Sequence, residues 1–391
     1  MILRLLTIAF LLLQTVTFGQ WEEVEGLPTN RDHGIGFSIN GYGYMLTGGD
    51  SPFGATKDFY KYDPTTDSWS QLPDYPGPNR GVGIGEVLDG KLYFGFGTDG
   101  FSYLNDLWEY DEATNTFTEL ASCPCQGRVH PALLAVDGKV YVGMGGDATG
   151  DLDDWWEYDI AGDSWTQKAF IPQVRHHPYQ FVVDGEMYVG AGHRTTWYKY
   201  DVANDDWIQI AGLTARVAGA QFSYNGKGYA LSGTDTNHDS YPVGQFWEYD
   251  PVSDTWTAMP NHPGTSRWAP SSFVIDNYVY LFGGYYYMGN LVAETTMWRF
   301  PLGPGAVSVD ETEEEVVNSV YPNPATDHLN IYTSANLTET AITNVYNLSG
   351  QLVLSVPFSQ QLDIANLTDG IYILDVVDEG VTVLKEKISK L

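Results

Sequence analysis

The chain has 391 residues, with 50 acidic side chains against 19 basic ones and a formal net charge of −31. This balance excludes ordinary binding to nucleic-acid backbones and to anionic membrane surfaces, because both carry charge of the same sign. An aromatic content of 14% excludes a disordered chain, and the length exceeds that of one typical domain. The composition suits a soluble extracellular protein.

The first 19 residues have the layout of a secretory signal peptide. Arg4 is followed by an apolar run and by a small residue, Gly19, at the end. No later stretch is long and apolar enough to span a bilayer, so we expect no membrane span once this segment is removed. The sequence predicts that residues 1–19 are cleaved and that the remainder leaves the cytoplasm.

Residues 20 to about 303 repeat one pattern. In five copies a Tyr-Asp pair is followed, six residues after the aspartate, by an aromatic residue. Two alternating apolar runs precede the pair; in residues 81–97 they flank a turn at Asp89-Gly90, which predicts a β-hairpin. The closing aromatics, 42 to 49 residues apart, are Trp69, Phe117, Trp165, Trp207 and Trp256. Four antiparallel strands per copy, repeated radially, predict the blades of a β-propeller.

The repeat resembles the kelch motif. The likeness rests on a Tyr seven residues before the closing Trp, as in Tyr62 and Trp69, and on a diglycine after the second apolar run. The diglycines are Gly48-Gly49, Gly145-Gly146 and Gly283-Gly284. The last copy lacks a fourth strand, whereas residues 21–27 form an unattached one, and in kelch propellers an N-terminal strand often completes the last blade. The resemblance implies an all-β domain over residues 20–303, a six-bladed kelch β-propeller closed by its N-terminal strand.

The character of the chain changes after residue 303. Residues 304–317 contain an acidic run and are predicted to be a solvated linker. Residues 318–391 resemble the C-terminal sorting domain of type IX secretion substrates in Bacteroidetes-type bacteria. The matching residues include Tyr321, Pro322, Asn323, Pro324, Asp327, Leu329, Gly350, Leu367, Gly370, Tyr372 and Lys385.

The tail resemblance implies a small β-sandwich that is recognised by the type IX machinery of the outer membrane. It also implies export, removal of the tail, and either release or attachment to surface lipopolysaccharide. The expected location is therefore the extracellular space or the outer-membrane surface. An accessory β-sandwich that binds a ligand is the alternative.

Each of the six expected blades opens on an arginine. These residues are Arg31, Arg80, Arg128, Arg175, Arg216 and Arg267. The innermost strand begins there, so we expect the six guanidinium groups at one mouth of the central channel. In four blades the residue 19 positions later is an aspartate, which predicts charge-assisted pairs that lock the hairpin mouth. The predicted pairs are Arg31 with Asp50, Arg80 with Asp99, Arg128 with Asp147, and Arg216 with Asp235.

Two blades lack that aspartate. Arg194 occupies the partner position of Arg175, and Tyr286 that of Arg267. This pattern predicts a positive mouth for an anionic ligand, since guanidinium matches carboxylate, sulfate or phosphate. Aromatic rings near the same rim suit a sugar. The predicted ligand-binding residues are Arg175, Arg194, Arg267, His177, Trp268 and Tyr286.

Histidines form a second set near the arginines. His33, His130 and His177 each follow their arginine by two residues. If the three histidines converged, they would offer ligands for zinc or copper. We expect the channel to be too wide for such convergence, so the histidines are predicted to form hydrogen bonds instead. No metal or other cofactor is predicted. His176 is expected to pack between blades.

An aspartate cluster and a pair of cysteines each allow more than one interpretation. Asp151, Asp153 and Asp154 lie close together but lack the closing Glu of a calcium loop, so calcium is not expected. Cys123 and Cys125, the only cysteines, either form a local disulfide or remain thiols. Their position in one loop also argues against a copper oxidase of the kelch class, which needs a cysteine crosslinked to a tyrosine.

The sequence therefore favours a secreted or cell-surface binding module. We expect its ligand, an anionic glycan or protein, to bind at the arginine-rich rim. No Ser-His-Asp order, phosphate loop or metalloprotease helix is present. The alternatives are an enzyme on acidic sugars, resembling a sialic acid mutarotase, and a structural surface protein in which every rim arginine is paired internally.

Overall fold

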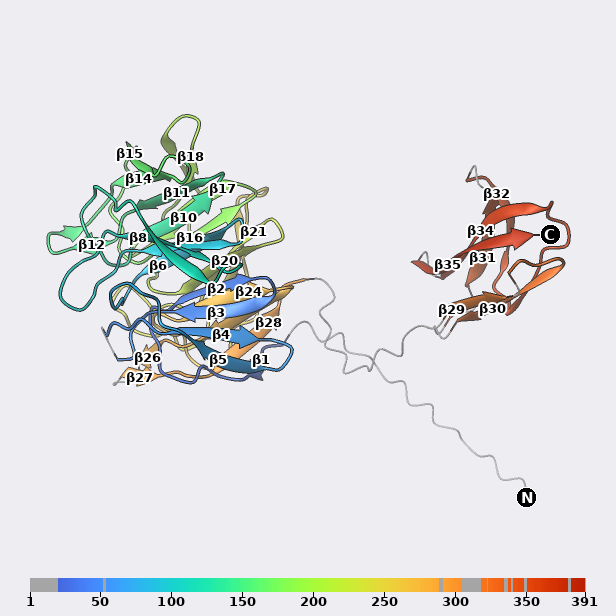
Figure 1. Cartoon of the computed structure of the whole chain (residues 1–391), viewed down its shortest axis with the longest axis horizontal. Coiled ribbons are helices and arrows are strands. Elements are labelled where there is room, and N and C mark those ends of the chain that lie inside the picture. Colours follow the sequence, from blue (N-terminus) through green and yellow to red (C-terminus); the bar gives the residue numbers. More distant parts are fainter. Residues whose placement is uncertain are drawn as a thin grey trace, which may run out of the picture. The chain divides into compact units, whose positions relative to one another are not determined.

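The computed structural model describes residues 20–51, 54–287, 291–303, 318–321, 323–333, 337–338, 340–347, 350–378 and 381–390. The expected signal peptide (1–19) and acidic linker (304–317) lie outside these residues. The chain divides into two compact units, Met1–Val307 and Ser308–Leu391 (Figure 1). Within the described ranges no helix is long and apolar enough to cross a membrane.

Unit 1 contains six four-stranded antiparallel sheets, which confirms the all-β class. The first sheet consists of β2 (Ile35–Ile39), β3 (Tyr42–Leu46), β4 (Phe59–Asp63) and β5 (Ser68–Leu72). The second consists of β6 (Ile84–Leu88), β7 (Lys91–Gly95), β8 (Leu107–Asp111) and β9 (Thr116–Leu120). The third consists of β10 (Ala132–Val136), β11 (Lys139–Gly143), β14 (Trp155–Asp159) and β15 (Ser164–Lys168).

The other three sheets follow the same plan. The fourth consists of β16 (Pro178–Val183), β17 (Glu186–Ala191), β18 (Trp197–Asp201) and β19 (Asp206–Ile210). The fifth consists of β20 (Ala220–Tyr224), β21 (Lys227–Leu231), β22 (Phe246–Asp250) and β23 (Thr255–Ala258). The sixth consists of β24 (Ser271–Ile275), β25 (Tyr278–Phe282), β28 (Met297–Pro301) and β1 (Glu22–Val24). Two short hairpins, β12 (Gly146–Asp147) with β13 (Gly150–Asp151) and β26 (Tyr285–Tyr287) with β27 (Leu291–Ala293), lie in loops.

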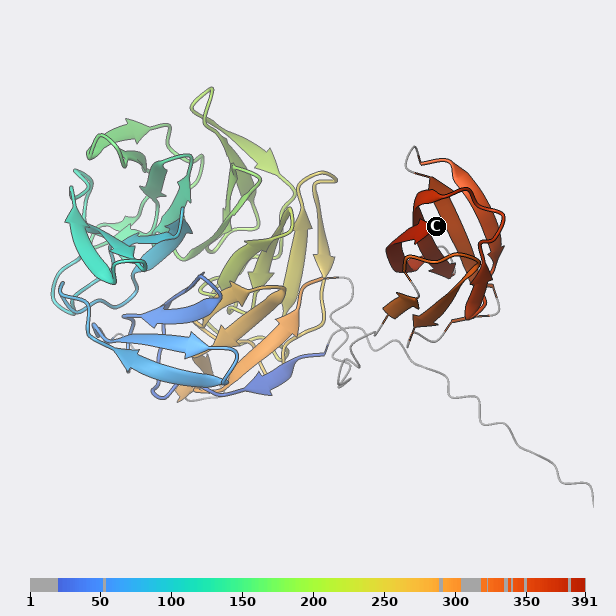
Figure 2. The same ribbon diagram turned by 45° about the vertical axis from the view of Figure 1, so that its right-hand side comes forward.

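The two ends of unit 1 meet in the sixth sheet. Strand β1 pairs with β28 in the register Glu22↔Arg299 to Val24↔Met297, as the unattached N-terminal segment predicted (Figure 2). Glu22 also accepts a hydrogen bond from Nε of Arg299 at 2.8 Å. The first strands of the other sheets contact one another in the order β2, β6, β10, β16, β20, β24, and β24 contacts β2 in turn.

The hydrophobic core of unit 1 lies between neighbouring sheets. Buried side chains from each consecutive pair of sheets, including the sixth and the first, form a shared cluster. The repeated aromatics supply the links: Trp165 donates from its indole nitrogen to the carbonyl of Ala121 in the preceding connection, 2.7 Å away. Burial of one large side chain of this kind contributes roughly 1.5–3 kcal/mol, which explains why the motif recurs in every sheet.

Unit 2 consists of two antiparallel sheets around one core. One sheet contains β29 (Asn318–Tyr321), β30 (His328–Thr333) and β33 (Gln361–Asp363). The other contains β32 (Leu352–Pro357), β31 (Ile342–Asn347), β34 (Gly370–Asp378) and β35 (Val381–Lys390). Buried residues of both sheets, among them Leu329, Val345 and Leu374, pack in the same cluster.

The expected sorting-signal residues are spread over unit 2. Asn323 donates from its amide to the carbonyl of Lys387 (2.8 Å) and accepts from the amide N–H of Ser389 (2.9 Å), which ties the start of the unit to β35. The hydroxyl of Tyr372, at the start of β34, donates to the carbonyl of Thr368 at 2.7 Å. Tyr321 ends β29, Pro324 follows Asn323, Gly350 lies between β31 and β32, and Gly370 begins β34; Pro322 lies outside the described residues.

Candidate functional site

The six arginines are buried inside unit 1. Each is at most 3% exposed, and Arg80, Arg128, Arg175 and Arg216 are fully buried. The prediction of an accessible guanidinium rim was therefore wrong. Each arginine side chain instead points into its own sheet, towards the residue that immediately precedes the third strand.

In the first three sheets that residue is an aspartate. Arg31 donates to Asp58 at 2.5 Å, Arg80 to Asp106 at 2.6 Å, and Arg128 to Asp154 at 2.8 Å. The carboxylates keep some exposure, whereas the guanidinium groups have almost none. The contacts of Arg80 and Arg128 are bidentate, whereas Arg31 also donates to the hydroxyl of Thr56. Such charge-assisted contacts compensate for the loss of water around a buried cation.

The predicted pairs with Asp50, Asp99, Asp147 and Asp235 were wrong. These aspartates stabilise the loops themselves. Asp99, for example, accepts from the backbone N–H groups of Phe101 and Ser102, at 2.8 and 2.7 Å. The reason is geometric: the residue just before the third strand lies within reach of the arginine, whereas these aspartates lie earlier in the loop.

In the other three sheets the residue at that position is neutral. Arg175 donates to the hydroxyl of Thr196 (2.8 Å), Arg216 to the side-chain carbonyl of Gln245 (2.7 Å), and Arg267 to the hydroxyl of Thr296 (2.8 Å). Burial lowers the pKa of Arg175 and of Arg267 to about 10, with the nearby Arg194 adding to the effect on Arg175. Thus neutral oxygens occupy the places where aspartate is missing, and Glu294 lies 3.8 Å from Arg267.

The remaining residues of the predicted ligand set are dispersed. Arg194 is exposed in the loop after β17, and Tyr286 lies half-buried in β26. Trp268 is only 7% exposed and packs edge-on against His33, with the ring centroids 4.7 Å apart. Arg175 and Arg267 are buried, so the anion site does not form on these residues as predicted.

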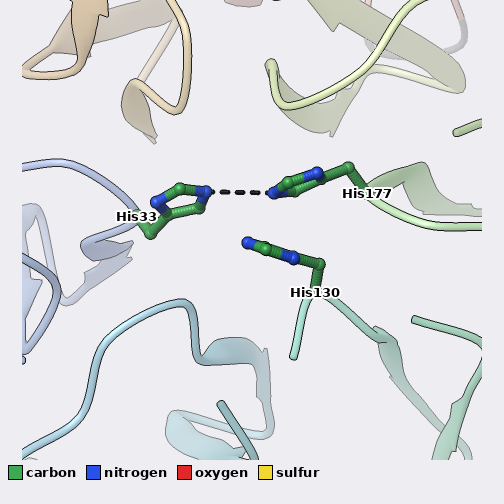
Figure 3. Close-up of side chains that lie close together, drawn as sticks. All are labelled: His33, His130 and His177. Atoms are coloured by element: carbon green, nitrogen blue, oxygen red, sulfur yellow. Dashed lines mark hydrogen bonds between the residues drawn. The ribbon is translucent and has the colours of Figure 1, made fainter. Parts of the chain in front are cut away.

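Three histidines, in contrast, meet at one point. His33, His130 and His177, here called the inner trio, offer ligand atoms that all lie within 4.8 Å of one another (Figure 3). They come from the first, third and fourth sheets. The expectation that the channel is too wide for them to converge was wrong.

The local backbone explains the convergence. Each inner histidine has a left-handed conformation, with φ of 47°, 53° and 52° for His33, His130 and His177. The corresponding residues of the other sheets, two positions after their arginines, have φ of 50° to 53° as well; they are Val82, Ala218 and Ala269. All six residues line one small cavity, which shows that this turn directs side chains to the same level. Histidine adopts the left-handed region more readily than most residues do.

The glycine after the second strand permits this arrangement. Gly48 has φ of 94°, and a Cβ atom there would lie 2.6 Å from the carbonyl oxygen of Asp32. Gly97 and Gly145 are confined in the same way. The backbone of each second strand therefore packs directly on the turn that carries the inner residue, which gives a physical reason for the repeated glycine.

The inner trio has a defined geometry. His33 Nε2 and His177 Nε2 lie 3.1 Å apart, and the ring centroids of His130 and His177 are 3.2 Å apart. Asp32, which is 1% exposed, places Oδ1 2.6 Å from His33 Nδ1. The carboxylate is placed to accept a hydrogen bond from Nδ1–H of His33, which leaves Nε2 facing the other two histidines.

Burial keeps two of the inner histidines, His130 and His177, uncharged. It holds the pKa of His130 and His177 well below the ordinary range, and the neighbouring imidazoles lower it further. Both ring nitrogens of His130 and the Nδ1 of His177 are shielded from solvent and lack a hydrogen-bond partner. Buried polar atoms without partners are uncommon, because each costs the desolvation free energy of the group.

Three more histidines surround the inner trio. They are His176, His193 and His238, here called the outer trio. The His176 ring lies 4.6 Å from His130, and His238 lies 5.9 Å from His177, measured between centroids. His176, expected to pack between blades, belongs to the fourth sheet and lies beside Gly146 and Asp151 in the loop of the third sheet. Six of the eight histidines of the chain therefore gather at one end of unit 1.

The cluster has the chemistry of a transition-metal site. Neutral imidazole nitrogens are typical ligands of zinc and copper. Within the part of the chain that the structure describes, this trio is the one group of three or more His, Cys, Asp or Glu residues whose ligand atoms converge. The Asp151, Asp153 and Asp154 segment forms no oxygen cage there, because Asp154 is bound to Arg128.

Space at the inner trio is limited. The adjoining cavity has a volume of about 90 Å³ and has room for water molecules. A sugar ring needs more room than that. The cavity therefore suits an ion with its water ligands.

The sequence reasoning overlooked a carboxyl group in the central cavity. This cavity is lined by β2, β6, β16, β20 and β24, and Glu86 of β6 faces it. Burial raises the pKa of Glu86 to about 7. Among the first strands of the six sheets, all of them described, Glu86 is the only charged residue, and this was the signal available in the sequence.

The cysteines lie away from this site. Cys123 and Cys125 form a disulfide bond in the loop before β10. Both are buried between the second and third sheets. Of the two states that the sequence left open, the structure has the disulfide.

Comparison with known proteins identifies the tail. The family described as the secretion system C-terminal sorting domain matches residues 319–390, which lie in unit 2. This domain directs export by the type IX secretion system to the cell surface or the extracellular space, and it implies an interaction with that machinery. A comparison of the chain with curated proteins finds no match.

Proposed function

We propose that the protein is an extracellular binding module, in which unit 1 is a six-bladed propeller of the kelch type. The sorting domain supports the extracellular location. The six sheets, their shared cores and the pairing of β1 with β28 support the propeller. The binding surface is the set of loops between the second and third strands of each sheet, here called the loop face.

The loop face surrounds the inner trio. Short bridges such as Asp32↔Gly49 and Val129↔Gly146 join the end of each second strand to the residue before the inner position. In the described parts of these loops, partly or fully exposed aspartates outnumber the basic Lys57 and Arg194; they are Asp50, Asp99, Asp147, Asp151, Asp235 and Asp239. This charge favours a neutral or basic partner, in place of the anionic ligand that the sequence suggested.

Phe101 carries the proposal. Its side chain is 98% exposed, although the loop around it is fixed by the two hydrogen bonds from backbone N–H groups to Asp99. A loop whose backbone is ordered before binding loses less conformational entropy on association. Exposed aromatics of this kind anchor protein partners and stack on sugar rings. The enzyme on acidic sugars has less support, because the arginines that would bind a sugar carboxylate are buried.

The test compares two exposed apolar side chains at opposite ends of unit 1. The full chain and its Phe101→Ala and Val252→Ala variants are applied to arrays of neutral and acidic glycans and of surface proteins of the producing cell. Val252 is 94% exposed and lies between β22 and β23, at the end away from the loop face. We expect Phe101→Ala to weaken binding by about tenfold or more and Val252→Ala to leave it unchanged. Equal effects of the two substitutions, or an absence of binding, would contradict the proposal.

A further inference from the structure

We propose that His33, His130 and His177 bind one divalent transition-metal ion that favours imidazole ligands, Zn²⁺ or Cu²⁺. This site lies inside the mouth that the loop face surrounds and does not depend on a partner there. Three sheets that are far apart in the sequence each contribute one ligand. The donor set consists of nitrogen atoms alone, which favours zinc or copper over calcium or magnesium.

The spacing of the nitrogens fits such an ion. Two imidazole nitrogens bound at 2.0–2.1 Å in tetrahedral geometry lie about 3.3 Å apart. The observed distance between His33 Nε2 and His177 Nε2 is 3.1 Å. Since all the ligand atoms lie within 4.8 Å, an adjustment of about 1.5 Å brings His130 into the same geometry. Figure 3 shows the His130 ring directed towards the line between the other two.

Asp32 would support the metal ligand His33 without contacting the ion. Histidines that bind metals usually donate their other N–H to a carboxylate or a carbonyl, which fixes the ring and raises the basicity of the ligand nitrogen. The contact of 2.6 Å between Asp32 Oδ1 and His33 Nδ1 has this form. A buried carboxylate also adds negative charge beside the site, which favours a cation.

The unpartnered nitrogens favour a ligand over a purely structural cluster. A hydrogen-bonded histidine network would satisfy the buried ring nitrogens, yet both nitrogens of His130 have no partner. The His33–His177 contact satisfies one nitrogen of each ring and leaves Nδ1 of His177 unpartnered. A bound ion would take a lone pair from each ring, including the one on His130.

The surroundings leave one coordination position open. The equivalent inner residues Val82, Ala218 and Ala269 have no donor atom, so the fourth ligand is water or a member of the outer trio. Asp151 lies 3.4 Å from His176 Nδ1, and Asp235 lies near His238. These carboxylates make the approach to the site favourable for a cation.

The experiment measures binding of ZnCl₂ and CuSO₄ to the full chain after treatment with a chelator. Isothermal titration calorimetry should show one ion per chain, and the Cu²⁺ complex should show nitrogen hyperfine splitting in its EPR spectrum. His130→Ala should weaken binding at least about 100-fold, the upper range for the loss of a supporting residue. His328→Ala, which removes an exposed histidine of unit 2, is the matched control and should bind normally.

Two results would overturn the site. One is the lack of stoichiometric binding of either ion to a chain whose thermal unfolding shows it to be folded. The other is equal binding by the His130→Ala and His328→Ala variants. A His130→Gln variant tests the case in which alanine disturbs folding, because glutamine fills more of the space of the ring; it should also lose binding while the chain stays folded.

Discussion

Asp154 binds the guanidinium of Arg128 through both carboxylate oxygens, from the position just before the third strand of the same sheet. The same relationship joins Arg80 to Asp106. In both pairs the arginine is buried and the aspartate is partly exposed. The pair thus locks the first and third strands of a sheet together at the end where the inner trio lies.

Removal of one partner should leave a buried, uncompensated charge. We expect Asp154→Ala to lower the free energy of unfolding by roughly 3 kcal/mol, near the lower end of the range for a broken buried pair, because Asp154 keeps some exposure. Urea denaturation measures the change. Asp147→Ala is the control, since Asp147 bonds only within its own loop, to Thr149, and should cost less than about 1 kcal/mol. A larger loss for Asp147→Ala than for Asp154→Ala would refute the observed pairing.

Glu86 should make unit 1 less stable as the pH rises. Burial raises its pKa from 4.5 to about 7, so the folded chain retains a proton that the unfolded chain releases between these values. Relative to Glu86→Gln, we expect the free energy of unfolding of the parent to fall by roughly 3 kcal/mol between pH 4.5 and pH 7. Urea titrations at several pH values measure the difference. A difference that does not change with pH would show that Glu86 has an ordinary pKa.

His262 should make unit 1 less stable as the pH falls. It is 2% exposed, and burial, followed by the charge of Arg267, lowers its pKa from 6.5 to about 3. The unfolded chain therefore gains a proton below pH 6.5 that the folded chain does not take up until about pH 3. Compared with His262→Gln, the parent should lose roughly 3 kcal/mol of unfolding free energy between pH 7 and pH 4.5. An equal change in the free energy of unfolding of the two proteins between these pH values would contradict this expectation.

Asp32 should support metal binding without contacting the ion. We expect Asp32→Asn to weaken Zn²⁺ binding about 10- to 100-fold, because the neutral amide no longer fixes the tautomer of His33. Calorimetry of the folded variant measures the affinity. Asp50→Asn, which changes an exposed aspartate on the loop face, is the control and should leave the affinity within about twofold. Unchanged affinity in Asp32→Asn would place Asp32 outside the metal site.

The repeat made the strands predictable from the sequence. The spacing of Trp69, Phe117 and the later aromatics corresponds to the fourth strands of successive sheets, and the unattached Trp21 segment matches β1. These features follow from the alternation of buried and exposed side chains along a strand, which the sequence shows as alternating apolar and polar residues. The residues that pair with the arginines were not predictable in this way. The spacing of 19 residues between an arginine and the next loop aspartate does not show which part of the loop lies beside the arginine and which part projects beyond the sheet.

The candidate site depended on backbone geometry that the residue pattern does not display. The two-residue offset from Arg31 to His33 placed three histidines at equivalent positions, but the left-handed φ at those positions decides that they converge. The same turn carries Val82 and Ala218, so nothing in the residue types marks it. Asp32 could have been noticed as the acidic neighbour of His33, but only the structure shows that its side chain turns towards the ring.

The pairing of Glu22 with Arg299 spans 277 positions of the chain. The sixth sheet consequently has the highest contact order of the six, and its closure must wait until β28 is available. Until then β1 has no strand with which to pair. The order of folding is thus set by the last sheet: five sheets can assemble as they are made, whereas completion of the unit requires both of its ends at once.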